Sequence, residues 1–209
     1  MNIFDMHARE YDQWYEKNKC LYLSELKALR QLLPKQGKCL EIGVGTGRFA
    51  GPLGIKYGVE PSDNMAIIAE KRGVKVYKGI AEKLPFPDKS FDYVLFVTTL
   101  CFVKDIKKAL KEARRVLRKN GVVIIGMLDK DSKLGRKYFQ KREDSSFYRN
   151  AKLHSASEII FLLKKYGFKT NKIIQTIFGE CDKAQKFKKC SGEGLFVAIK
   201  SVKLSLKNL

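Results

Sequence analysis

The chain has little that would indicate a metal centre, a membrane span or a disulfide framework. Its 209 residues include five cysteines, an odd number, and none of them forms a Cys-x-x-Cys pair, so no zinc site is predicted. No stretch approaches the roughly 18 apolar residues that a membrane span needs. Residues 1–5 lack a basic region followed by an apolar run, which predicts no secretory signal. Together these absences favour a reduced, cytoplasmic protein.

Acidic residues are also scarce. The chain has 22 Asp and Glu against 42 Lys and Arg, a net charge of +20. Residues 1–100 carry 15 basic and 12 acidic side chains, whereas residues 101–209 carry 27 and 10. A second half this positive would attract polyanions such as RNA. A lysine-rich solvated surface explains the same numbers without any partner, and both interpretations stand at this point.

The order of predicted elements indicates a single α/β domain spanning residues 1–209. Residues 3–33 have helical spacing and end at Pro34 and Gly37, so we expect residues 1–36 to form a helical cap. Strand signals then alternate with helix-length polar stretches. The predicted strands are 38–42, 55–59, 74–78, 91–97 and 121–127. This order predicts a doubly wound parallel sheet that binds ligands at the carboxyl ends of its strands.

The last third of the chain differs from the rest in composition and predicted structure. Residues 129–154 are polar, charged and interrupted by aromatics, which predicts a long excursion from the sheet that faces the substrate. A helix is expected at 157–166. The β-branched and aromatic runs 172–178 and 195–201 predict an antiparallel hairpin that closes the sheet. Earlier in the chain, an amphipathic helix is predicted at 104–118, with Asn120-Gly121 as its stop signal.

The most informative segment is the loop after the first predicted strand. Glu41 and Ile42 are followed by glycines at 43, 45 and 47. Glycines allow sharp turns and let a ligand approach the main-chain N–H groups. A dinucleotide fingerprint requires Gly-x-Gly-x-x-Gly, but here the third glycine comes one residue early and Arg48 stands where that fingerprint has glycine.

The Glu-x-Gly-x-Gly-x-Gly loop resembles the first motif of class I S-adenosylmethionine-dependent methyltransferases of the ubiquinone/menaquinone-biosynthesis type. Further segments similar to that family's motifs follow in its order: 58–62 (Gly-Val-Glu-Pro-Ser), 79–86, 91–94 and 116–121. The resemblance covers residues 38–129 and extends more loosely to both ends. It implies a Rossmann-like methyltransferase fold with seven strands in the order 3-2-1-4-5-7-6, strand 7 antiparallel. It also implies S-adenosylmethionine as cofactor, S-adenosylhomocysteine as product and no metal.

The same resemblance assigns the cofactor residues. Glu60 is expected to accept from both ribose hydroxyls, and Glu41 from the loop or the methionine ammonium. Pro61 and Met65 are expected to cover the adenine, with the N–H of Ala81 on a ring nitrogen. The full expected set is Glu41, Gly43, Gly45, Gly47, Glu60, Pro61, Met65, Ala81, Glu82 and Thr98.

Three features depart from the family. Ile80 stands where an acid usually receives the adenine amino group, and its side chain cannot accept a hydrogen bond. Glycines and a proline within residues 48–56 predict that the next helix has only a turn or two. Cys101-Phe102 replaces the His-His pair that often follows strand four. No catalytic base is identified.

The acceptor side is less defined. The aromatic residues Tyr11, Trp14 and Tyr22 are predicted to close over the cofactor and to favour its cationic sulfonium; ordinary helix packing explains them equally well. Further candidates for substrate contact are Thr99, Tyr148 and His154, the last two also for proton acceptance.

The function predicted from the whole pattern is methyl transfer to a small-molecule acceptor by in-line displacement. The segment Val97-Thr98-Thr99-Leu100 lacks the Asn/Asp-Pro-Pro-Tyr/Phe motif of base amino-methyltransferases, and the Pro-Cys of a cytosine-C5 enzyme is absent. Two alternatives remain. One is an RNA or protein methyltransferase that uses the basic second half, and the other is a non-catalytic protein that only binds the cofactor.

Overall fold

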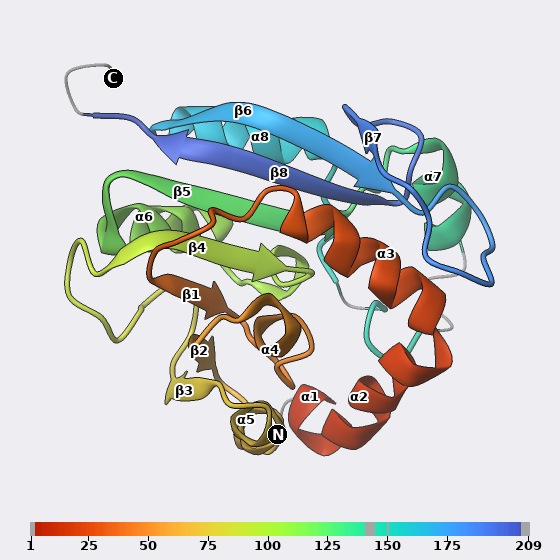
Figure 1. Ribbon diagram of the computed structural model, residues 1–209, viewed down its shortest axis with the longest axis horizontal. Helices are drawn as coiled ribbons and strands as arrows, with labels where there is room; N and C mark the ends of the chain where they lie inside the picture. Colours follow the sequence, from red (N-terminus) through yellow and green to blue (C-terminus); the bar gives the residue numbers. More distant parts are fainter. Residues whose placement is uncertain (1–2, 141–144, 150, 206–209) are drawn as a thin grey trace.

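The computed structural model of the protein describes residues 3–140, 145–149 and 151–205. One mixed sheet runs through the molecule, with helices on both faces (Figure 1). Its strand order is β3-β2-β1-β4-β5-β8-β6-β7. The strands are β1 (Cys39–Ile42), β2 (Tyr57–Glu60), β3 (Lys75–Lys78), β4 (Phe91–Val97), β5 (Leu117–Leu128), β6 (Phe168–Thr176), β7 (Lys188–Lys189) and β8 (Phe196–Lys203).

The predicted topology is present with one addition. β1 to β5 are parallel neighbours, β8 lies antiparallel between β5 and β6, and so β8 is the predicted strand 7 and β6 the predicted strand 6. The hairpin predicted from residues 172–178 and 195–201 is formed by β6 and β8. The eighth strand, β7, has two residues and pairs with β6 at the sheet edge. A segment this short gives no detectable alternating pattern in the sequence.

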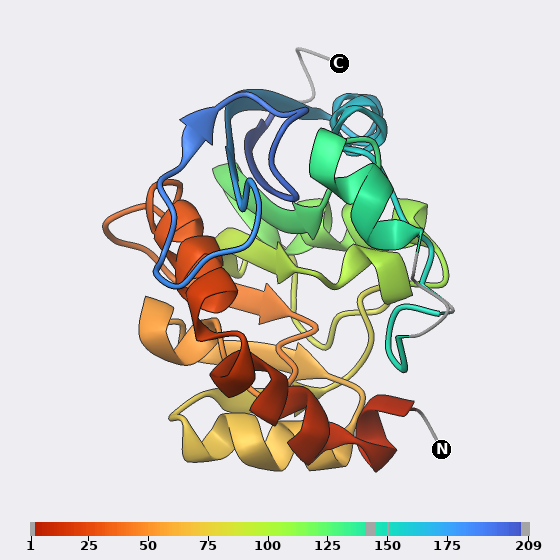
Figure 2. The same cartoon turned by 90° about the vertical axis from the view of Figure 1, so that its right-hand side faces the viewer.

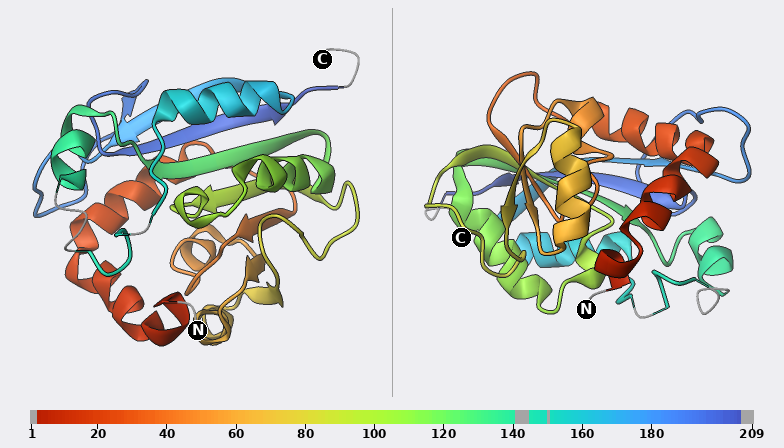
Figure 3. Two further views of the ribbon diagram at one scale, coloured as in Figure 1. Left: turned by 180° about the vertical axis from the view of Figure 1, so that it is seen from behind. Right: turned by 90° about the horizontal axis from the view of Figure 1, so that it is seen from below.

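Helices cover the two faces of the sheet unequally. They are α1 (Ile3–Met6), α2 (Ala8–Lys17), α3 (Lys19–Arg30), α4 (Ala50–Leu53), α5 (Asp63–Lys71), α6 (Ile106–Val116), α7 (Lys133–Phe139) and α8 (Ala156–Lys165), with a 3₁₀ turn at Leu100–Phe102. α6 and α8 lie on one face and α3 and α4 on the other (Figures 1 and 3). The four-residue α4 confirms the predicted short helix after the glycine loop.

β4 shows how the sequence produces two cores. Val94 and Phe96 pack with residues of α6 and α8, whereas Tyr93, Leu95 and Val97 pack with residues of α3 and α4. Successive side chains of a strand point to opposite faces, so a strand that is apolar at nearly every position must be covered on both sides. This double cover leaves only the strand ends open to a ligand.

The prediction that the helix before β5 runs to residue 118 and stops at Asn120-Gly121 was wrong. α6 ends at Val116, and Leu117 is already extended and pairs with Phe91 of β4. Asn120 has φ of 58° within β5, where the register with β4 shifts. The same Asn-Gly pair that ends helices also makes tight turns, which is why the sequence signal was misread.

The predicted cap corresponds to α1, α2 and α3, which run along the edge where the strands β1 and β4 end (Figure 2). Cys20 in α3 and Cys181 form a disulfide with 6.1 Å between their Cα atoms. This contradicts the expectation that the cysteines are all reduced. The pairing joins residues 161 positions apart, and no spacing motif marks it. Across the described ranges, no helix combines the length and apolarity that crossing a membrane requires.

Candidate active site

The loop that leaves β1 holds three glycines in a backbone conformation that other residues rarely adopt. The φ angles of Gly43, Gly45 and Gly47 are 69°, 53° and 77°, in the left-handed region that favours glycine. The N–H groups of Gly43 and Val44 donate to the carbonyl oxygen of Val59 at 2.8 and 3.0 Å. The loop is therefore fixed against the end of β2.

The three glycines make room for different neighbours. A Cβ on Gly43 would lie 2.3 Å from Cγ2 of Thr99, and one on Gly47 would lie 3.0 Å from a backbone atom of α5. A Cβ on Gly45 would come within 4 Å of a single neighbouring atom, Cε1 of Tyr11, at 3.8 Å. Gly43 thus permits a close approach of strand ends, Gly47 permits helix packing, and Gly45 opens toward Tyr11.

β2 ends in a carboxylate that two backbone donors hold in place. Glu60 is buried; its Oε2 accepts from the N–H of Gly45 at 2.9 Å and its Oε1 from the N–H of Ser62 at 3.0 Å. Burial raises the pKa of Glu60, and the two backbone hydrogen bonds oppose that shift. Each oxygen keeps a further lone pair, so the fixed carboxylate can still accept from a ligand.

A cavity of about 340 Å³ lies over this loop, the end of β2 and the residues after β3. Of the residues predicted to bind the cofactor, those that line it are Gly43, Gly45, Glu60, Pro61, Met65, Ala81, Glu82 and Thr98. Ile80, which replaces the usual acid, also lines it and is half exposed.

The lining fits an adenosine-containing cofactor. The Glu60 carboxylate suits the ribose hydroxyls, and Val59, Met65 and Ile80 give an apolar wall for a purine. Gly45 leaves its side of the cavity without a side chain. The oxygen Oε1 of Glu82 already accepts from two N–H groups, those of Lys104 and Asp105, at 2.9 and 3.1 Å, so this side chain also braces the start of α6.

Glu41 lies away from the residues that line this cavity. It is almost fully buried, and its Oε2 has no hydrogen-bond partner among the described residues. Burial raises the pKa of Glu41 well above its usual range, with a smaller contribution from the nearby Glu60 charge. The structure therefore places this acid beneath the glycine loop.

The cap contributes two aromatic rings to the cofactor cavity, Phe4 of α1 and Tyr11 of α2. α1 is tied to the start of α5: Oδ1 of Asp5 accepts from the hydroxyl of Ser62 at 2.7 Å and from the N–H of Asn64 at 3.2 Å. These bonds hold α1 against Ser62 and Asn64, shortly after Glu60.

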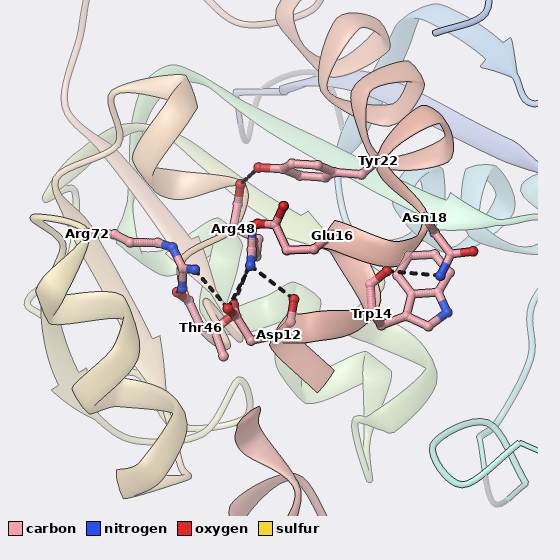
Figure 4. A network of polar contacts seen from close by, with 8 residues as sticks. All are labelled: Asp12, Trp14, Glu16, Asn18, Tyr22, Thr46, Arg48 and Arg72. Carbon is pink, nitrogen blue, oxygen red and sulfur yellow. Dashed lines mark hydrogen bonds and ion pairs between the residues drawn. The ribbon is translucent and has the colours of Figure 1, made fainter. Parts of the chain in front are cut away.

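A network of ion pairs clamps α2 to the glycine loop (Figure 4). The guanidinium of Arg48 donates from two nitrogens to the Asp12 carboxylate, at 2.8 and 2.7 Å, and also pairs with Glu16. Arg72 adds a third bond to Asp12 at 2.9 Å and donates to the Thr46 carbonyl oxygen. Burial alone would raise the pKa of Asp12, but the Arg48 and Arg72 hydrogen bonds outweigh it and lower that pKa to about 2.

Tyr22 is part of this clamp and does not line the cofactor cavity. Its hydroxyl donates to the carbonyl oxygen of Arg48 at 2.5 Å (Figure 4), and its ring packs edge-on against Phe49 and Tyr15. The structure thus brings Tyr11 to the cofactor cavity and leaves Tyr22 in the packing between α3 and the loop.

A second cavity, of about 90 Å³, adjoins the first, since Tyr11 and Thr98 line both. Its walls are mainly aromatic: Tyr11, Trp14, Tyr15, Tyr138, Phe147 and Tyr148. Among the described residues that line it, Glu25 of α3 supplies the carboxyl group, and this residue is 4% exposed. Burial raises the pKa of Glu25 to about 8.

Thr98 stands where the two cavities meet, at the carboxyl end of β4. Its φ is 48°, a strained value for a residue with a Cβ, and its N–H donates to the Gly126 carbonyl oxygen at 2.8 Å. The Thr99 hydroxyl donates to the Val97 carbonyl oxygen at 2.9 Å and faces the cofactor cavity.

His154 lies behind the aromatic cavity rather than in it. It lines a small void of about 20 Å³ together with Thr98, Cys101 and Tyr148. Its Nδ1 is 3.6 Å from a Glu158 carboxylate oxygen, and burial lowers its pKa. Of the predicted substrate residues, the structure gathers Tyr11, Trp14 and Tyr148 around one cavity, and places Thr99, Tyr22 and His154 elsewhere.

The fold, the glycine loop and the carboxylate at the end of β2 define a class I S-adenosylmethionine-dependent methyltransferase. The comparisons with known proteins agree. The family described as "Methyltransferase domain" matches residues 40–125. A crystal structure from Thermotoga maritima, described as a SAM-dependent methyltransferase, possible histamine N-methyltransferase, is 50% identical with a TM-score of 0.93; the match covers 96% of this chain and 98% of that one.

Two curated relatives show the range of sequence similarity. Uncharacterized protein MJ1123 of Methanocaldococcus jannaschii is 51% identical over 206 residues, 98% of this chain and 100% of that protein. Demethylmenaquinone methyltransferase of Staphylococcus aureus is 31% identical over 140 residues, 58% of this chain and 57% of that protein. The chain belongs to the methyltransferase-domain family and is a S-adenosylmethionine-dependent enzyme.

The sequence analysis missed Glu25. The signal was present, because Glu25 is three residues after Tyr22 and four before Leu29 and so shares the buried face of α3. It also missed the acidic partners of Arg48, Asp12 and Glu16, because both lie more than 30 residues before Arg48 and no motif links them to it.

Proposed function

We propose that the protein transfers a methyl group to a small-molecule acceptor that binds in the aromatic cavity beside the cofactor. The observation that carries this proposal is the shared wall: Tyr11 and Thr98 line both cavities. The volume of about 90 Å³ is smaller than the roughly 300–1,000 Å³ of typical ligand pockets, so it restricts the acceptor to a compact molecule.

The cofactor side is assigned to the residues that line the larger cavity. Glu60 would accept from the ribose hydroxyls, and Met65 and Pro61 would cover the adenine near the N–H of Ala81. When bound, S-adenosylmethionine supplies a methyl group on a positively charged sulfur, and the electron pair of the broken carbon–sulfur bond stays on sulfur. The protein's part is to hold the acceptor in line and to exclude water.

The cap performs the second of these tasks. Phe4 and Tyr11 form part of the cofactor cavity wall, and the Asp12–Arg48 clamp keeps α2 over the glycine loop. Water kept out by these rings strengthens electrostatic interactions inside the site.

The experiment is a transfer assay with methyl-labelled S-adenosylmethionine. Small amines, phenols, thiols and quinols would be offered in parallel with transfer RNA and a basic-protein mixture. Histamine belongs in the first group because the Thermotoga maritima protein is described as a possible histamine N-methyltransferase. We expect label in at least one small molecule. Label confined to RNA or protein would overturn the proposal and would favour a role for the positive second half of the chain. The cytoplasmic location predicted from the sequence stays a prediction.

A further inference from the structure

The aromatic cavity holds a carboxylate that the fold itself does not use. Glu25 is 4% exposed and lines this cavity. Among the residues that the structure describes, none donates a hydrogen bond to the Glu25 carboxylate or places a lysine or arginine beside it, and burial is the single cause that shifts its pKa. A buried carboxyl group without a partner costs stability, so its position calls for a ligand.

The cavity holds an acidic group although the chain as a whole is strongly basic. The protein carries a net +20, yet no lysine or arginine stands among the described residues that line this cavity. A single carboxylate within aromatic walls disfavours anions such as phosphate or carboxylate groups. It favours a cation, which the faces of Tyr, Trp and Phe rings also attract.

We propose that the acceptor is a primary or secondary amine, and that Glu25 binds its ammonium group and then accepts its proton. This inference rests on the proposed function, because it names the acceptor of the same site. The aromatic rings around Glu25 would enclose the organic part of the amine.

The proton transfer balances without any further reagent. An ammonium nitrogen has no lone pair and cannot attack a methyl group. A proton moves from that nitrogen to a carboxylate oxygen of Glu25, which leaves a lone pair on nitrogen, a neutral amine and a neutral Glu25. That lone pair is the nucleophile that in-line methyl transfer needs.

Other groups near the cavity are poorly suited to take this proton. Within residues 3–140, 145–149 and 151–205, the titratable side chains that interact with Glu25 are Tyr11 and Tyr15 from α2, Tyr138 from α7 and Tyr148. Burial raises the pKa of each, to about 12 for Tyr11, so they keep their protons near neutral pH. The pKa of Glu25, about 8, lies closer to the operating pH, where a general base is most effective.

The entry route is compatible with a small amine. A larger cavity of about 580 Å³ shares part of its wall with the aromatic cavity, including Leu21, Tyr138 and Tyr148. Tyr138 is 42% exposed, so this larger cavity reaches the surface at α7.

The first test measures binding, with no turnover. The full chain is saturated with S-adenosylhomocysteine and titrated in a calorimeter with ethylamine, 2-phenylethylamine and tyramine, each paired with the alcohol of the same skeleton. We expect at least one amine to bind tenfold or more tightly than its alcohol. Glu25→Gln should remove that preference, whereas Glu10→Gln, the same change at an exposed position of the cap, should keep it. Equal binding of all three pairs, or a preference that survives Glu25→Gln, would overturn the proposal.

The second test separates proton acceptance from a structural role. In wild-type protein, kcat/KM for the amine identified in the first test should rise with pH and level off above about pH 8, where Glu25 is ionised. In Glu25→Gln it should fall at least tenfold at pH 7 and recover as pH approaches the amine's own pKa, where free amine is present. A uniform loss at every pH would refute the base role. If phenols or thiols are methylated and amines are not, this inference fails while the proposed function stands; if no small molecule is methylated, the proposed function itself fails.

Discussion

Each of the two cavities at the active-site edge has a buried glutamate in its wall, and the two glutamates differ in their hydrogen bonds. In the cofactor half, the two oxygens of Glu60 accept from the backbone N–H groups of Gly45 in the glycine loop and Ser62. In the acceptor half, Glu25 has no such donor among the described residues. The Glu60 carboxylate is held in place before a ligand binds, whereas the Glu25 carboxyl group is free to bind one. The cofactor half thus depends on backbone donors at the ends of neighbouring strands, whereas the acceptor half depends on side chains from elements far apart in the sequence.

The strongest way to break the cofactor half is to fill its glycine loop. Gly43→Ala adds a Cβ 2.3 Å from Cγ2 of Thr99 at a φ of 69°. Strain and overlap together should cost more than about 3 kcal/mol of unfolding free energy, measured by urea titration. Gly54→Ala is the matched control: its φ is 73°, but a Cβ there has nothing within 4 Å. We expect that control to lose only about 1 kcal/mol; equal losses would show that Thr99 plays no part.

The burial of Glu25 in the acceptor half can be tested by the pH dependence of stability. The pKa of Glu25 is about 8 in the folded chain and about 4.5 as a free side chain. The folded state therefore binds the extra proton between these values, and stability falls as pH rises through them. Wild-type protein should lose roughly 2 to 3 kcal/mol relative to Glu25→Gln between pH 6 and pH 9. Melting curves of both proteins, without ligand, measure this difference. Parallel curves would mean that Glu25 is solvated or already paired.

Ligand affinity is the direct test of Glu60. Glu60→Gln replaces one acceptor oxygen with an N–H₂ group that faces a backbone donor. We expect S-adenosylhomocysteine to bind about 2 kcal/mol more weakly, roughly thirtyfold, by calorimetry. Glu70→Gln, an exposed change on α5, should leave the affinity unchanged. An affinity within twofold of wild type for Glu60→Gln would remove the ribose role.

The same contrast explains how far the sequence could be interpreted. The glycine loop, Glu60 and the residues after β3 follow their strands directly and resemble family motifs, so their places at the sheet edge were predicted from that resemblance together with the strand order. Arg48 was noticed only as a departure from a dinucleotide fingerprint, because its partner Asp12 comes 36 residues earlier. Glu25, in the cap helix α3, and Tyr148 lie more than 100 residues apart in the sequence but line the same cavity. No local pattern indicates such a contact. Of the predicted excursion 129–154, residues 141–144 and 150 lie outside the described residues, and the sequence does not indicate that Tyr138 and Tyr148 line a cavity together with the cap.

The clamp that joins the two halves gives the smallest expected effect and an opposite pH signature. The pKa of Asp12 is about 2 in the folded chain, below its unfolded value of about 3.9. Its stabilising contribution is therefore complete above about pH 5 and is lost as pH falls through 4 toward 2. Asp12→Asn should cost about 1 to 2 kcal/mol at pH 7, and the difference from wild type should shrink by pH 3. Asp88→Asn removes an exposed carboxylate from Arg115 and should cost at most about 0.5 kcal/mol. If Asp12→Asn lowers stability but leaves amine and cofactor affinities unchanged, α2 is a brace alone; if both affinities fall, the clamp holds the cofactor half and the acceptor half in one working geometry.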